Sequence, residues 1–323
     1  MPNLFIIGNG FDLAHKMKTS FNDFRDYLYL NYPEGMDNGL YVPDPVTGPS
    51  GEDLLCEAYV AGLIAYLLNE VAPDDKNNKS MPDWSEIEKF LGMMDLKECF
   101  DCVEPQCDKE GDRNYFWERE IAESICGSMA LAIPQITDFL SEWIRTVEIS
   151  KSPICRFREL IHPNEDLFLT FNYTQTLEKL YACEKANVCH IHGAVSDTFY
   201  QDEKLILGHC ESKNYLCDES VPCEMGDGLQ EIYEKLRKDT AEQMRLHADF
   251  FNRIKNTKIE KIYSFGFSFA AVDLPYIQKV CGSIDTKQIS WGLNIYDEES
   301  RRLQYMNTIK QLGFQGNFFT YST

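Results

Sequence analysis

Short apolar runs recur along the chain, each bounded by turn or polar residues and each about as long as a buried β-strand. They lie at Leu4–Ile7, Leu167–Phe171, Val188–Ile191, Leu205–Leu207, Ile259–Phe265 and Ile289–Ile295. Segments with helical periodicity lie between and after them, at Phe21–Leu30, Thr174–Ala186, Leu229–Asn256, Leu274–Cys281 and Glu298–Leu312. Strands that alternate with helices predict an α/β fold, a Rossmann-like and mostly parallel sheet with helices on both faces.

The pattern changes between residues 32 and 162. A loop rich in Pro and Gly occupies 32–51, and helical stretches follow at Glu52–Val71, Trp84–Met94 and Tyr115–Thr146. None of these apolar runs falls inside this segment. We therefore predict a single α/β domain over residues 1–323, with a helical insertion at 32–162 between its first and second strands.

The composition narrows the class of protein. No run approaches the ~18 apolar residues that a membrane span needs, and the N-terminal MPNLFII lacks the basic region of a signal peptide, so we expect a cytoplasmic protein. The formal net charge is −21 at pH 7. Such a surface repels phosphate backbones, and nucleic acid is therefore a disfavoured partner.

The cysteines offer a competing type of site. Two groups have the residue types of zinc ligands, namely Cys99, Cys102 and Cys107, and His209 and Cys210 with Cys217 and Cys223. Neither group has the four ligands in paired spacing that a zinc ribbon needs. We expect reduced thiols and no metal, with a structural zinc as the alternative.

The first predicted strand ends in Gly8-Asn9-Gly10, followed by Asp12. Two residues without a Cβ permit a tight turn and close approach of a phosphate to backbone N–H groups. Leu13 occupies the position where the dinucleotide fingerprint has Gly or Ala, so an ordinary glycine turn is an equal interpretation. The Asp12 carboxylate could cap the following turn or accept a hydrogen bond from a ribose hydroxyl.

Polar side chains also follow two later strands. Asn172 comes after the strand that ends in Thr170-Phe171, where an amide could either bond to the turn backbone or face a ligand. Strand alternation predicts that His190 and His192 point to the same face, and Gly193 then lets the chain turn. The histidines could face a ligand, pair at a metal or be satisfied inside the core.

A second glycine turn, Ser264-Phe265-Gly266-Phe267-Ser268, ends another predicted strand. A backbone N–H near Ser268 could bind an anion, or the turn could be purely structural. Asp273 then has the form of an N-cap, with Pro275 in the first helical turn. Because ligands bind at the carboxyl ends of parallel strands, these loops should gather around one crevice.

Four segments together resemble the bacterial AbiH family of abortive-infection proteins over essentially the whole chain: GNGFDLAHKMKTSFNDF, FNYTQTLE, HIHG and GFSFAAVDLPY. AbiH motifs are similar, more distantly, to the sirtuin-like NAD-binding domains of phage-defence effectors. The family's serine-containing turn usually reads Gly-His-Ser, and Phe267 stands at the position of that His. The acidic partner that follows Asn in sirtuins has no match, because Tyr173 and Thr174 follow Asn172.

The resemblance implies roles for particular residues. Gly8, Asn9, Gly10 and Asp12 would form the nucleotide loop, Asn172 and His192 the catalytic pair, and Gly193, Gly266 and Ser268 further nucleotide contacts. The ligand would be NAD or a related nucleotide. An amide and an imidazole suit hydrolysis of the nicotinamide–ribose bond, since they can hold the ribose and orient a nucleophile.

We therefore expect a phage-defence effector that binds a dinucleotide and hydrolyses NAD. One alternative is a noncatalytic nucleotide sensor or interaction module, and a less favoured one is a nuclease, for which the sequence lacks a compact carboxylate metal motif. Its partner would be a further copy of the same chain, in a homo-oligomer, or a phage-derived trigger.

Overall fold

The computed structural model of the chain describes residues 1–71, 84–94, 96–100, 107, 109–196, 204–217 and 223–323. These residues form two compact units. The first contains 1–20, 144–206 and 239–323, and the second contains 21–143 and 207–238. Every residue expected to carry chemistry at the strand ends lies in the first unit.

A six-stranded sheet forms the centre of the first unit. Its strands are β1 (Leu4–Ile7), β4 (Leu167–Thr170), β5 (Val188–His190), β6 (Lys261–Phe265), β7 (Ser290–Asn294) and β8 (Asn317–Tyr321). They lie in the order β5-β4-β1-β6-β7-β8, and every neighbouring pair is parallel. This is the doubly wound order 3-2-1-4-5-6 when these strands are counted along the chain. The predicted Rossmann-like α/β fold is confirmed.

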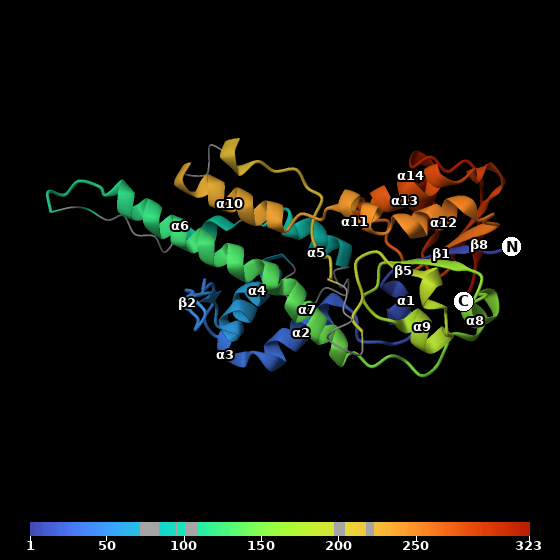
Figure 1. Cartoon of the computed structure of the whole chain (residues 1–323), viewed down its shortest axis with the longest axis horizontal. Coiled ribbons are helices and arrows are strands. Elements are labelled where there is room, and N and C mark those ends of the chain that lie inside the picture. The colour runs from blue at the N-terminus through green and yellow to red at the C-terminus, as the bar shows by residue number, and fades with distance from the viewer. Residues whose placement is uncertain (72–83, 95, 101–106, 108, 197–203, 218–222) are drawn as a thin grey trace. The chain divides into compact units, whose positions relative to one another are not determined.

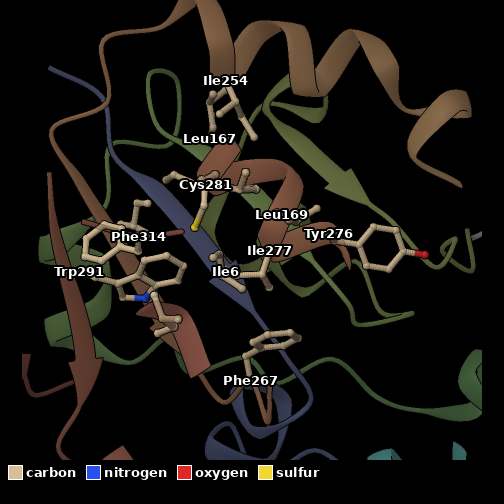
Figure 2. Close-up of a cluster of buried hydrophobic side chains, with 14 of the residues drawn as sticks. Ile6, Leu167, Leu169, Ile254, Phe267, Tyr276, Ile277, Cys281, Trp291 and Phe314 are labelled. Atoms are coloured by element: carbon tan, nitrogen blue, oxygen red, sulfur yellow. The ribbon is translucent and has the colours of Figure 1, made fainter. Parts of the chain in front are cut away.

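Helices cover both faces of this sheet (Figure 1). On one face lie α12 (Ala248–Asn256), α13 (Leu274–Ser283) and α14 (Glu299–Gln311), and on the other α1 (Gly10–Ala14), α8 (Cys155–Leu160) and α9 (Thr176–Tyr181). Successive side chains of β1 point to opposite faces of the sheet. Leu4 and Ile6 lie in the core under α12–α14, whereas Phe5 and Ile7 lie in the core under α1, α8 and α9. Figure 2 shows the first of these cores, where Ile6 lies beside Ile277.

Several predicted elements differ from the structure. Leu205–Leu207 forms no strand, because the N–H of Ile206 donates to the carbonyl of His192 instead of to a neighbouring strand. The predicted helix Leu229–Asn256 is broken into α10 (Cys223–Lys235), α11 (Thr240–Leu246) and α12. The helix predicted at Thr174–Ala186 is only α9, since Ala182 takes a left-handed conformation with φ 54°.

The second unit is mostly helical. It contains α2 (Phe21–Asn31), α3 (Pro33–Met36), a hairpin of β2 (Val46–Thr47) and β3 (Asp53–Leu54), α4 (Glu57–Val71), α5 (Trp84–Leu91), α6 (Tyr115–Ala132), most of α7 (Ile136–Thr146) and α10. Inside it, a buried ion pair joins the Lys238 ammonium to Glu88 at 2.5 Å. The predicted insertion at 32–162 overlaps this unit with different bounds, so the single-domain boundary stays a prediction.

The turns after β1 and β6 touch through their backbones. The N–H of Gly8 donates to Phe265 O at 3.0 Å, and that of Gly10 to Gly266 O at 3.0 Å. A Cβ at Gly8 would lie 2.4 Å from Gly266 O, and one at Gly266 would lie 2.3 Å from the nitrogen of Phe11. Gly266 also has φ +64°. Only glycine permits this approach, because any side chain would collide with backbone.

We expect Gly266→Ala to lower the free energy of unfolding by about 3 kcal/mol, since it adds both a collision and an unfavourable φ. The matched control is Gly282→Ala in α13, where a Cβ meets open space. That change should leave stability unchanged or raise it by up to about 1 kcal/mol. Urea unfolding followed by circular dichroism measures both, and equal effects would contradict the role assigned to Gly266.

Candidate functional site at the carboxyl edge of the sheet

The strands β1, β4, β5 and β6 all end at the same edge, because they are parallel. β1 lies at the centre, with β4 and β5 on one side and β6 on the other. The strand order therefore reverses at β1, which is the position where doubly wound sheets bind their ligands. The segments that follow these strands carry the predicted site residues.

The first glycine turn is held by its own contacts. The N–H groups of Gly8 and Gly10 are already used in bonds to the turn after β6. The Asn9 side chain donates from Nδ2 to Thr19 O at 2.9 Å and so closes the following loop. The glycines thus have a structural reason to be glycine, and their contact with a nucleotide stays a prediction.

Asp12 lies inside this edge and is 1% exposed. Its carboxylate accepts hydrogen bonds from Thr174 Oγ1 at 2.5 Å and Thr176 Oγ1 at 2.9 Å. It is the carbonyl of Asp12, and not its side chain, that accepts the N–H groups in the next turn. Burial raises the pKa of Asp12 to about 6, although hydrogen bonds from both threonines and from Asn172 oppose the rise.

Asn172 follows β4 directly and is 6% exposed. Its backbone N–H donates to Thr170 Oγ1 at 3.2 Å, and its side chain interacts with Asp12 closely enough to lower the pKa of that carboxyl. A carboxylate is an acceptor, so the NH₂ group of the Asn172 amide faces Asp12. The carbonyl oxygen Oδ1 is buried and has no hydrogen-bond partner. The Asn172 amide therefore has its NH₂ group toward Asp12 and keeps one acceptor unused.

His190 bridges two neighbouring segments. Its Nδ1 lies 2.9 Å from the backbone carbonyl oxygen of Asn172, and its Nε2 lies 2.8 Å from Glu178 Oε1. Both partners are acceptors, so a proton on each ring nitrogen satisfies both contacts. The charge of His190 also lowers the pKa of Asp12. Sequence reasoning did not find Glu178, which lies in α9.

His192 has a different environment from His190. Its Nε2 lies 3.2 Å from Asp273 Oδ1, and both side chains are largely buried, at 4% and 9% exposure. Its ring packs edge-on against Phe171 and Tyr276, which belong to the core under α12–α14. The prediction that both histidines point to one face is wrong. β5 ends at His190 and the chain turns, so strand alternation does not reach His192.

Asp273 is the acidic partner that sequence reasoning missed. It precedes α13, as predicted for an N-cap, but its side chain makes no capping hydrogen bond. The carboxylate instead faces His192. An Asp before Leu-Pro is a typical helix-start signal, so the sequence pattern explained Asp273 without a second role.

The remaining predicted residues shape the turns. Gly193 has φ +81° and donates its N–H to His190 O at 3.0 Å, closing the turn after β5. Ser268 is half-buried, between Phe267 and Phe269, which both enter the core under α12–α14. Phe267 therefore fills a core position, as Figure 2 shows.

A cleft of about 280 Å³ opens beside the edge strand β5. Its lining comes from Gln175, Glu178, Lys185, Ala186, Val188, Cys189, His190, Ala194, Leu246, His247, Asp249, Phe250 and Arg253. These described lining residues include His190, which the sequence offered as a candidate histidine, and none of the residues that the resemblance assigned to the nucleotide or to the catalytic pair. The contacts of His190 with Asn172 and Glu178 connect the cleft to the Asp12 cluster.

The cysteine alternative is only partly covered by the structure. Cys102 and the side chains of Cys217 and Cys223 lie outside the described residues. Within the described part of the chain, Cys99, Cys107 and Cys210 form no disulfide bond. No group of three or more His, Cys, Asp or Glu side chains there is placed to hold a metal ion. No helix in the described ranges combines the length and apolar character of a membrane span.

The fold and this edge define a doubly wound α/β protein with a buried Asp–Asn cluster and a His–Asp pair beyond its central strands. The chain belongs to the family described as Bacteriophage abortive infection AbiH, which matches residues 4–295. The predicted family is thereby confirmed, whereas the sirtuin-like similarity stays a prediction. Neither the curated proteins nor the solved structures contain a match to this chain.

The raised pKa of Asp12 predicts how stability depends on pH. The Asp12 carboxyl loses its proton at about pH 6 in the folded state and at about pH 3.8 in the unfolded state. As the pH rises between these values, ionisation of Asp12 therefore lowers the free energy of unfolding. The cost reaches about 3 kcal/mol above pH 7. Asp12→Asn should therefore gain stability relative to the wild type by about that amount from pH 4 to pH 8.

Urea unfolding of both proteins at each pH measures this difference. The matched control is Asp37→Asn, which changes an exposed carboxylate at the end of α3. Its stability should follow the wild type at every pH. A constant gap between Asp12→Asn and the wild type, or one that narrows as the pH rises, would refute the assignment.

Proposed function

We propose that this member of the abortive-infection family acts as an effector that binds NAD at the carboxyl edge of its sheet and hydrolyses the nicotinamide–ribose bond. Loss of NAD would halt metabolism in the infected cell before the phage completes its cycle. The family membership supports the role in abortive infection. The ligand and the reaction are our inference from the edge residues.

The Asn172 amide is the observation that carries this proposal. Its NH₂ group faces Asp12, and its Oδ1 is a buried acceptor without a hydrogen-bond partner. An unpaired buried acceptor costs free energy of about 1–3 kcal/mol, so it is typical of a functional site that a ligand completes. A ribose hydroxyl or a water molecule would donate to this oxygen.

The His192–Asp273 pair supports the chemical step. A proton on Nε2 donates to Asp273 and leaves the lone pair on Nδ1, which makes Nδ1 the basic atom of the ring. A carboxylate that orients an imidazole also stabilises the imidazolium that forms when the ring takes up a proton. Asp273 thus suits His192 to act as a general base.

The proposed reaction needs no acid for the leaving group. Water attacks C1′ of the nicotinamide ribose, and the C1′–N bond breaks with its electron pair going to the cationic ring, which leaves as neutral nicotinamide. The attacking water gives its proton to His192 Nδ1, and the other product is ADP-ribose. The side-chain oxygen Oδ1 of Asn172 would hold the ribose or the water in line for attack.

Nicotinamide release from NAD tests this proposal. We expect Asn172→Ala and His192→Ala to lower the rate at least about 100-fold, because each removes a group that acts in the transition state. The controls Asn252→Ala and His162→Ala change exposed residues of the same unit and should keep wild-type turnover. The assay is run on purified protein and, to include a phage-derived trigger, on NAD in infected cells.

Unchanged turnover in both edge variants would reject the assigned pair. Stable NAD with both purified protein and infected cells would reject the reaction. Retained NAD binding without nicotinamide release would favour a noncatalytic sensor.

Asp273→Asn tests the orientation of His192 separately. We expect kcat to fall about 10- to 100-fold with KM nearly unchanged, since the substitution removes the charge that stabilises the imidazolium and not a substrate contact. The acid limb of the kcat–pH profile should move to lower pH, because a ring without its carboxylate protonates less readily. Asp285→Asn, an N-cap elsewhere in the unit, is the control and should change neither. An unshifted pH profile would contradict the pairing.

A further inference from the structure

The cleft beside β5 has the features of a second binding element that the proposed reaction does not use. Its volume of about 280 Å³ is close to the lower end of the range of small-molecule pockets, roughly 300–1,000 Å³. Its walls come from α9, β5 and the α11–α12 junction, all within the first unit. A sugar with a base or phosphate attached is of suitable size for this space.

An unsatisfied oxygen of Glu178 is the observation that indicates a ligand in this cleft. Its Oε1 pairs with His190 Nε2 at 2.8 Å, which fixes the carboxylate in place. Its second oxygen, Oε2, is buried and has no hydrogen-bond partner. A carboxylate oxygen is only an acceptor, so the group that completes it is a donor such as a hydroxyl. A charged acceptor forms stronger hydrogen bonds than a neutral one.

The rest of the lining indicates what else the ligand carries. Val188, Leu246 and Phe250 give the cleft an apolar wall, and Phe250 belongs to the core under α12–α14. The exposed Lys185 brings a cation into the lining. The Arg253 guanidinium bonds to Ala186 O and to Asn187 Oδ1, and so holds the segment before β5.

We propose that this cleft binds the ribose of a nucleoside 5′-phosphate, with Glu178 Oε2 accepting a ribose hydroxyl and Lys185 facing the phosphate. Only the identification of the ligand as part of a dinucleotide rests on the proposed function. The binding chemistry requires just a hydroxyl-bearing sugar phosphate. His190 joins both sites, because it contacts Glu178 on the cleft and the carbonyl of Asn172 at the edge.

Calorimetric titration of the full chain with AMP, adenosine and 2′,3′-dideoxy-AMP tests this proposal without any turnover. The wild type should bind AMP at least about 10-fold more tightly than the dideoxy compound, because only AMP can donate to Glu178. Glu178→Gln should lose this discrimination. Lys185→Gln should reduce the affinity for AMP to that for adenosine.

The control is Glu184→Gln, an exposed carboxylate before β5 that is not among the described lining residues, and it should bind all three compounds as the wild type does. Equal affinity of the wild type for AMP and dideoxy-AMP, or no binding of AMP, would overturn the proposal. If Glu178→Gln does not fold, Lys185→Gln decides the question, because Lys185 is exposed and lines the cleft, and is not one of the edge residues assigned to NAD. AMP binding without nicotinamide release would reject only the NAD reaction. Nicotinamide release without AMP binding would reject only the proposal for the cleft.

Discussion

The close contact between the turns after β1 and β6 is the constraint on which the edge of the sheet depends. Because Gly8, Gly10 and Gly266 have no side chains, the two backbones meet and α1 starts at once. This early start brings Asp12 beneath the segment that follows β4, where Thr174 donates to it. The Asn172 amide then faces this carboxylate. The absence of side chains at these three glycines thus determines how the Oδ1 acceptor of Asn172 is oriented.

Electrostatics complements this steric condition. The chain carries a formal charge of −21, yet it also buries the Asp12 carboxylate at the edge, where desolvation disfavours the charged form. Asp12 is held by hydroxyl and amide donors, whereas Glu178 and Asp273 each face a histidine. A histidine can change charge near neutral pH, so the pairs with histidine can respond to a ligand or a proton, and Asp12, whose pKa is raised to about 6, can also take up a proton near that range.

Much of the fold could be predicted, because buried strands are apolar runs of the right length. The run 205–207 was misleading, since its backbone bonds to a turn, and β8 was missed because its residues are only partly buried at a sheet edge. The helix break at 236–239 carries no Gly or Pro to announce it. The pairing of His192 with Asp273 joins residues far apart in sequence, and only the sheet order brings them together.

The two parts of the edge belong to opposite faces of the sheet. Asn172 turns its amide toward α1, whereas His192 packs among rings of the core under α12–α14. Their backbones follow adjacent strands, and adjacent strands lie only about 4.8 Å apart. A ligand that touches both side chains must therefore cross the ends of β4 and β5 and be flanked from two sides. A sugar ring that carries groups at both ends fits this requirement, whereas a ligand that enters from one face alone reaches only one of the two.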